Sequence, residues 1–221
     1  MSSCQCSLES GDPWSQGLDL SLLLPVISLI FTVVSKLLLL YSTIDKTSRL
    51  KIKSFSTVRF TQRGSQCYME KRRGLSRLDL GIASLHMPCI KPGSRKENTA
   101  ALVKVMENPY VDIIGHPGDP RYDIDYKEVF RQAKATGTIL EINNASLIPG
   151  GFRDGSQENV KEILRMSMEE GISVVLGSDA HFYMGIGDFS YALALMKEVG
   201  FPEELVLNTD PVRFLASLKK R

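Results

Sequence analysis

The chain has 221 residues, of which 43% are hydrophobic and 24% are charged, and these fractions are ordinary for a globular protein. The formal net charge of +2 at pH 7 is too small to indicate a nucleic-acid partner. The four cysteines follow no CxxC spacing, so neither a disulfide framework nor a cysteine-rich zinc site is expected. A reducing, cytoplasmic location is the default expectation.

Residues 1–76 form a leader that differs from the remainder of the chain. Within it, residues 20–41 are almost continuously apolar, and about twenty such residues are enough to cross a bilayer. A signal peptide is disfavoured, because no basic region precedes the apolar run. The alternative to a cytoplasmic protein is a single-pass membrane protein with its C-terminal domain in the cytoplasm, because basic residues follow the run: Lys46, Arg49, Lys51, Lys53, Arg59 and Arg63.

The leader allows three interpretations. The stretch from Lys51 to Arg73 shows no helical or strand period, and the change to regular patterning near Leu78 is abrupt. A misassigned gene start or a shifted reading frame would explain this change. A genuine membrane anchor and a soluble disordered leader are the other two interpretations. In each case the folded domain is expected at residues 77–221.

Beyond Leu78 the pattern alternates between strands and helices, which predicts parallel βα units. The expected strands are LDLGIASLH (78–86), VDIIGH (111–116), TILEIN (138–143), the start of ISVVLGSDAH (172–181) and a short strand at 205–207. One expected helix is capped by Asp125 with Glu128 as its capping-box partner, and Gly137 ends it. The others cover 97–107, 157–170 with Ser156 as cap, 191–199, and a last helix opened by Asp210 and Pro211.

Each of the three histidines lies just past an expected strand: His86, His116 and His181. Asp179 stands two residues before His181. In a β/α barrel the carboxyl ends of the strands share one face, so we expect these four side chains to line one pocket. A single strand-end histidine is ordinarily a hydrogen-bonded loop residue, and an aspartate after Gly-Ser is often a turn cap. The joint pattern favours ligation of Zn, Mn or Fe.

Candidate phosphate-binding groups lie on the same loops. The loop at 115–120, Gly-His-Pro-Gly-Asp-Pro, is dense in glycine and proline and can hold a ligand in place. Arginine guanidinium groups bind phosphate well, although exposed surface charge explains each arginine equally well. The expected substrate-binding residues are Arg95, Arg121, Arg153 and, at the end of a strand, Asn143.

The motifs LDLGIASLH, VDIIGHPGDPRY, LEINNAS and VLGSDAH resemble the later motifs of the PHP (polymerase and histidinol phosphatase) family, in particular the YcdX-like phosphatases. The resemblance covers about two thirds of the chain, from near Arg77 to the end. It implies a distorted (β/α)7 TIM-like barrel with up to three metal ions, usually zinc or manganese, that hydrolyses phosphomonoesters. Carried over residue by residue, it makes metal ligands of His86, His116, Asp179 and His181, with Asp179 and His181 catalytic.

The chain departs from the family at its start. The family's first motif is an H-x-H, followed by another histidine, an Asp-His pair and a bridging glutamate, whereas no histidine precedes His86 here. We therefore expect an incomplete TIM-like barrel that lacks its first strands, and metal sites with at most two protein ligands each. The leader would be unrelated to the barrel.

The function expected from this resemblance is a metal-dependent phosphoric monoester hydrolase. A metal-activated water would attack the phosphate ester of a small phosphorylated substrate. The expected cofactor is Zn²⁺, or alternatively Mn²⁺ or Fe, with fewer ions than the family's three. The alternative is a catalytically impaired metal-binding remnant or a membrane-tethered non-enzymatic protein, with residues 20–41 at the membrane. A polymerase-linked exonuclease would need nucleic-acid contacts that the nearly neutral C-terminal half does not indicate.

Overall fold

The computed structural model describes residues 79–87 and 90–219 in full, and the backbone of residues 55–63 and 66–69. The apolar segment 20–41, with most of the expected leader, lies outside the described residues. No helix in the described part of the chain is long and apolar enough to span a bilayer.

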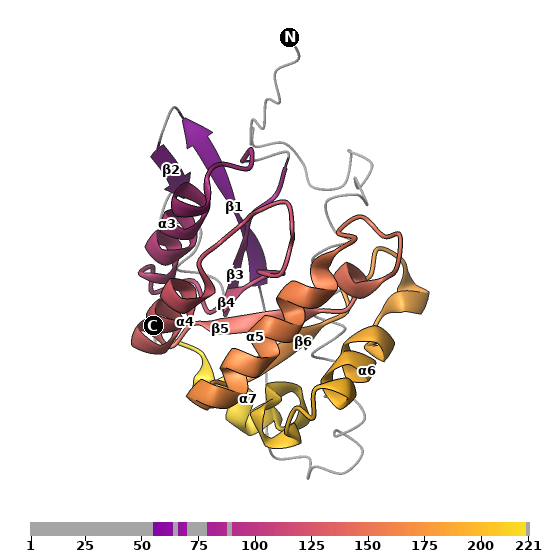
Figure 1. Cartoon of the computed structure of the whole chain (residues 1–221). Coiled ribbons are helices and arrows are strands. Elements are labelled where there is room, and N and C mark those ends of the chain that lie inside the picture. The colour runs from indigo at the N-terminus through magenta and orange to yellow at the C-terminus, as the bar shows by residue number, and fades with distance from the viewer. Residues whose placement is uncertain (1–54, 64–65, 70–78, 88–89, 220–221) are drawn as a thin grey trace, which may run out of the picture.

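Six strands form one sheet in the order β2-β1-β3-β4-β5-β6 (Figure 1). All neighbours from β1 to β6 run parallel, and β2 is an antiparallel edge. The strands are β1 (Phe55–Arg63), β2 (Gln66–Met69), β3 (Leu80–Ser84), β4 (Ile113–Ile114), β5 (Ile139–Asn143) and β6 (Val174–Gly177). The predicted α/β class and the four strands β3 to β6 are therefore confirmed.

Two strands were not expected from the sequence. The stretch from Lys51 to Arg73 shows no strand period, but it contains both β1 and β2. The backbone of β1 pairs with β3 from Phe55 opposite Leu80 to Arg59 opposite Ser84. Pairing with a neighbouring strand stabilises extended backbone even where the local pattern of side chains gives no sign of it.

The helices follow the strands as the pattern predicted. They are α3 (Arg95–Met106), α4 (Tyr126–Thr136), α5 (Ser156–Glu170), α6 (Ser190–Glu198) and α7 (Pro211–Ser217). The Asp125 carboxylate caps α4 by accepting from the backbone N–H groups of Lys127 and Glu128. A reciprocal capping box lies at α3, where Ser94 and Glu97 each accept from the other's backbone N–H.

The expected cap of α5 was wrong. The helix begins at Ser156 itself, and the preceding Gly155 has a φ of 89°, a conformation that glycine adopts without strain. The Ser156 hydroxyl points back and donates to the Arg153 carbonyl at 2.7 Å.

The expected strand at 205–207 was also wrong. Val206 lies between the short 3₁₀ helices η3 (Glu203–Leu205) and η4 (Leu207–Thr209). It is joined to Val174 by an isolated parallel bridge and not by a strand. The side-chain amide of Asn208 pairs with the β6 edge instead. Leu176 N donates to Asn208 Oδ1 at 2.6 Å, and Asn208 Nδ2 donates to Leu176 O at 3.0 Å.

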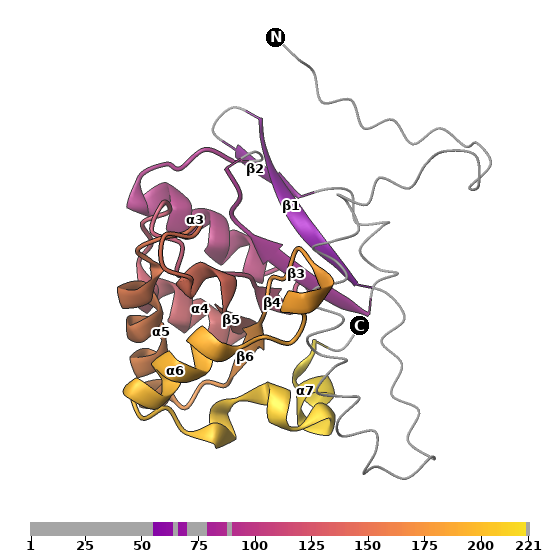
Figure 2. The ribbon, with the colours of Figure 1, turned by 90° about the vertical axis from the view of Figure 1, so that its right-hand side faces the viewer.

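The sheet is covered differently on its two faces. Helices α3 to α6 lie on one face, and α7 lies against the other (Figure 2). Because side chains alternate along a strand, Leu140 and Ile142 of β5 pack in the core beneath α3 to α6. Ile139 points the opposite way and packs in the second core with Phe214 of α7.

On the face of the sheet that carries α7, polar residues gather at one end. The amino end of this face is apolar, whereas the carboxyl ends of the strands present Ser84, Glu141 and Asn143, all of them buried. Gly115 follows β4 and Gly177 ends β6, and a Cβ atom built at either glycine would lie within 3.4 Å of a Glu141 carboxylate oxygen. The carboxyl ends of parallel strands are where ligands bind in α/β proteins, so the site is built there.

Candidate functional site

Two of the predicted ligands lie in contact after neighbouring strands. His86 follows β3 and His116 follows β4, and their Nε2 atoms are 3.2 Å apart. The rings meet edge to face, with an interplanar angle of 84°. Burial, together with the charges of Arg153 and His86, holds the pKa of His116 well below its usual range. Its ring is therefore neutral near pH 7, which is the form that binds a metal ion.

Backbone geometry marks His116 and Asp179. Their φ angles are 37° and 50°, and they are the non-glycine residues with positive φ in the described part of the chain. A side chain in the left-handed region costs about 1–3 kcal/mol, and such strain clusters at active sites and ligand-binding turns. Both residues stand where a strand turns into its loop, so the turns fix the directions of the imidazole and the carboxylate.

A buried glutamate lies beneath His116. Glu141 Oε2 accepts from the backbone N–H of His116 at 2.8 Å and from Asn143 Nδ2 at 3.3 Å. Burial raises the pKa of Glu141 to about 7, and the nearby charge of Asp179 acts in the same direction. Glu141 is not among the site residues predicted from the sequence. A lone carboxylate within the apolar strand TILEIN was the signal that could have singled it out.

Gly177 makes room for this carboxylate. A Cβ atom built at Gly177 would lie 1.8 Å from Glu141 Oε1. We expect Gly177→Ala to lower the free energy of unfolding by about 1–3 kcal/mol, because the buried carboxylate must move away from its hydrogen bonds with the His116 N–H and Asn143. The measurement is urea unfolding of both proteins.

A second substitution tests the cause of this effect. In a Glu141→Ala background the clash is gone, so Gly177→Ala should then change stability by less than about 0.5 kcal/mol. If Gly177→Ala lowers stability equally in both backgrounds, the added Cβ atom clashes with a group other than the Glu141 carboxylate.

An ionic network ties together the loops that follow β4, β5 and β6. Arg153 Nη1 donates to Asp179 Oδ2 at 2.9 Å, and Arg153 Nε lies 3.6 Å from Asp119 Oδ2. Arg121 Nε donates to Asp119 Oδ1 at 2.8 Å. The side chains of Arg153 and Asp119 are only 8% and 3% exposed, so this network is part of the interior. Asp119 is a second site residue that is not among those predicted from the sequence.

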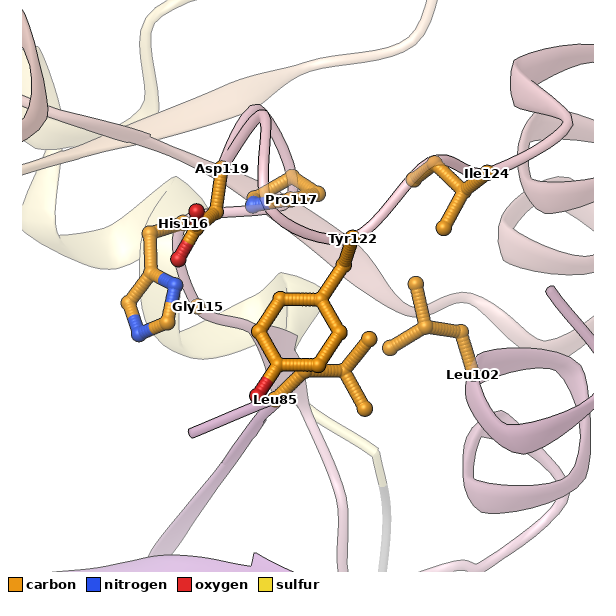
Figure 3. A pocket seen from close by; sticks show the side chains of 8 residues that line it. All are labelled: Leu85, Leu102, Gly115, His116, Pro117, Asp119, Tyr122 and Ile124. Carbon is orange, nitrogen blue, oxygen red and sulfur yellow. The ribbon is translucent and has the colours of Figure 1, made fainter. Parts of the chain in front are cut away.

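Asp119 also borders the histidine pair. It lines a small cavity together with His116, Tyr122 and other residues, with room for about one water molecule (Figure 3). The Tyr122 hydroxyl donates to the Ile90 carbonyl at 2.7 Å and so joins the loop after β4 to the segment after His86. The imidazoles and the ionic network therefore belong to one continuous site.

Two predicted residues lie at the edge of this site or away from it. His181 is exposed, and its Nδ1 atom lies 3.0 Å from the Asp179 backbone oxygen. Arg95 is also exposed, at the start of α3, where its Nε donates to the Ile124 carbonyl at 3.2 Å.

Two more predicted residues are held by protein groups. Asn143 Oδ1 accepts from the N–H and the hydroxyl of Ser146, which places it as a support for the loop after β5. The Arg121 guanidinium is bound by Asp119 and lies over the Phe152 ring.

The histidine pair fits part of a metal site. Two imidazoles on one tetrahedral zinc, each bound at about 2.0–2.1 Å, would have nitrogens about 3.3 Å apart. The 3.2 Å separation of the two Nε2 atoms is close to that value. Among the described residues no group of three or more His, Cys, Asp or Glu side chains is placed to hold a metal ion. The pair thus fits two positions of a cation site.

The chain is similar to several proteins that are named as phosphatases. The chain is 45% identical over 144 residues to a protein of Clostridium novyi named a probable phosphatase, which covers 65% of this chain and 58% of that protein. A probable phosphatase of Clostridium botulinum strain Langeland is 43% identical over 145 residues, or 66% of this chain and 58% of its own length. A probable phosphatase of Thermoanaerobacter sp. strain X514 is 45% identical over 148 residues, or 66% and 60%.

These matches cover only part of the chain and part of each relative. No protein-family model matches the sequence. The chain spans 58% to 60% of the length of these curated relatives. It is therefore similar, over about two thirds of its residues, to part of several proteins named as phosphatases.

Proposed function

We propose that this chain is a metal-dependent phosphoric monoester hydrolase of the PHP type, acting on a small phosphorylated substrate. The contact between His86 and His116 carries the proposal, because the 3.2 Å separation of their Nε2 atoms suits two ligands of one cation. The names of the relatives support a phosphatase. Parallel strands with the site at their carboxyl ends also suit part of a distorted β/α barrel.

Each of the predicted ligands would have its own role in metal binding. His86 and His116 would hold one cation, whereas Asp179 and His181 would be ligands of other ions, so that each ion has at most two ligands from the described residues. Zn²⁺ is the proposed ion, and Mn²⁺ or Fe are alternatives. When bound, such an ion polarises phosphoryl oxygens and lowers the pKa of a water molecule toward neutrality.

Arg153 is the best placed of the predicted phosphate-binding residues. Its Nε–H is buried and has no hydrogen-bond partner among the described residues, since the 3.6 Å approach to Asp119 is too long for a hydrogen bond. A buried donor of this kind ordinarily finds a partner, and a phosphate oxygen would be one. Two carboxylates flank the guanidinium, so the positive charge is already partly compensated.

A second candidate is a catalytically impaired metal-binding protein. It is favoured by one observation, namely that no group of three metal-binding side chains is found in the described residues. Catalytic zinc ordinarily has about three protein ligands. A membrane tether at residues 20–41 and a cytoplasmic location of the folded domain stay predictions, since that segment is outside the described residues.

Metal binding by the purified full chain separates these candidates. After treatment with EDTA, the protein is titrated with Zn²⁺ or Mn²⁺ in a calorimeter, and hydrolysis of p-nitrophenyl phosphate is then measured. We expect His86→Ala to weaken metal binding at least tenfold, by analogy with the roughly 10–100-fold effects of residues around metal sites. Asp154→Ala is the control, because Asp154 is an exposed carboxylate on the loop after β5.

The outcomes differ for each candidate. Metal binding with hydrolysis supports the phosphatase, and metal binding without hydrolysis supports the impaired protein. If the unmodified chain binds no metal and hydrolyses no ester, both are rejected. Equal metal affinity in His86→Ala and the unmodified chain would remove the histidine pair from the proposal.

A further inference from the structure

Phe152 is an exposed aromatic residue that is held in a fixed position. Its side chain is 78% exposed, on the loop that follows β5. The guanidinium carbon of Arg121 lies 4.4 Å from the centre of the ring, within cation–π distance. One face of the ring is therefore backed by Arg121, while most of the side chain is open to solvent.

The support beneath the ring is itself anchored. Arg121 is only 24% exposed and is bound through Nε and a terminal nitrogen to Asp119, which is 3% exposed. Two bonds to one carboxylate fix the plane of the guanidinium. The ring thus rests on a partly buried ion pair.

The backbone of Phe152 lies in a hydrogen-bonded turn. Asp154 N donates to Gly151 O at 3.2 Å across Phe152 and Arg153, and the preceding turn is closed by Gly151 N, which donates to Ile148 O at 3.0 Å. The next residue, Arg153, is buried and ion-paired to Asp179. Phe152 consequently has a set position beside the ionic network of the candidate site.

We propose that Phe152 is a stacking platform for a planar aromatic group of the substrate, so that the preferred substrates are aromatic phosphomonoesters. This inference rests on the proposed function, which supplies the phosphate end of the site at Arg153. A ring positioned by its neighbours loses little conformational freedom when a ligand stacks on it. Aromatic pairs prefer offset or edge-to-face stacking, which a saturated ring cannot reproduce.

Three phosphonates that cannot be hydrolysed provide the test. Methylphosphonate, cyclohexylphosphonate and phenylphosphonate are titrated by calorimetry into the full chain loaded with Zn²⁺. An aromatic pair contributes about 0.5–1.5 kcal/mol, so we expect phenylphosphonate to bind about two- to twelvefold more tightly than either other probe. Phe152→Leu, which keeps an apolar side chain, should remove this preference without changing the affinity for methylphosphonate.

Val212→Ala is the matched control. Val212 is an apolar residue on α7 with 66% exposure, and α7 packs on the amino end of the sheet. This variant should keep the preference for phenylphosphonate.

Other outcomes overturn the inference. If cyclohexylphosphonate binds as tightly as phenylphosphonate, the surface is merely apolar and the stacking platform is rejected. A preference that persists in Phe152→Leu rejects Phe152 as its source. If none of the three probes binds, the phosphate site itself fails and the proposed function fails with it, whereas equal binding of all three rejects only the platform.

Discussion

Replacing Arg153 by alanine is expected to lower the free energy of unfolding by about 3 kcal/mol, because breaking a buried ion pair leaves uncompensated charge in the interior. The Arg153 side chain lies between Asp119 and Asp179, and its own exposure is 8%. Its Nη1 atom donates to Asp179 and, at 3.3 Å, to Ser146 Oγ. Without it, Asp179 loses its counter-ion on the turn that carries a positive φ. Chemical unfolding of both proteins in urea measures the difference.

Arg165→Ala is the control for this prediction. Arg165 is exposed on α5, and surface changes of this kind usually alter stability by less than about 0.5 kcal/mol. A loss below about 1 kcal/mol for Arg153→Ala would mean that water compensates the two carboxylates. In that case Arg153 would bridge the loops without stabilising them.

The pattern of the sequence predicted the strands and helices that lie within the regular half. Long apolar runs gave β3, β5 and β6, and Gly137 and Gly171 end the helices that precede β5 and β6. Such signals predict elements well because hydrophobic periodicity, and the glycines at the ends of helices, depend on only a few neighbouring residues. β1 depends on pairing with β3, which a pattern within residues 51–73 cannot express.

The candidate site was harder to predict than the fold. Strand-end positions pointed to His86 and His116, and the structure brings their rings together. Their role as ligands stays a prediction. Glu141 and Asp119 were missed because their importance comes from burial and from partners 25 or more residues away, such as His116 and Arg153. Separation in sequence hides such contacts until the topology is known.

The buried carboxyl of Glu141 should make stability depend on pH in metal-free protein. Its pKa in the folded chain is about 7, raised from an ordinary value of 4.5. The folded state therefore binds more protons than the unfolded state between these two values, so stability falls as pH rises from about 4.5 to about 7. Above pH 7 both states are ionised and this contribution is constant. The loss at pH 8 is on the order of 3 kcal/mol relative to pH 4.

Glu141→Gln isolates this effect. Both hydrogen bonds to the Glu141 side chain end on Oε2, so a glutamine can accept them with its amide oxygen. The variant should match the unmodified chain near pH 4.5 and exceed its stability at pH 8 by up to about 3 kcal/mol. Urea unfolding at several pH values in EDTA measures both curves, and their difference cancels the other titrating groups.

The sign of the stability difference between Glu141→Gln and the unmodified chain at pH 8 shows whether the ionised Glu141 carboxyl stabilises or destabilises the fold. A side chain kept for stability would make the Gln variant weaker at pH 8, whereas the buried, partly protonated carboxyl predicts a stronger one. Proteins keep destabilising ionisable groups mainly at functional sites, where the charge acts on a ligand. Parallel pH curves for the two proteins would contradict this role, because Glu141 would then ionise equally in the folded and unfolded chains. A gain in stability of the Gln variant that appears only above about pH 5 is the expected result, and it would show that ionisation of the buried Glu141 carboxyl destabilises the fold.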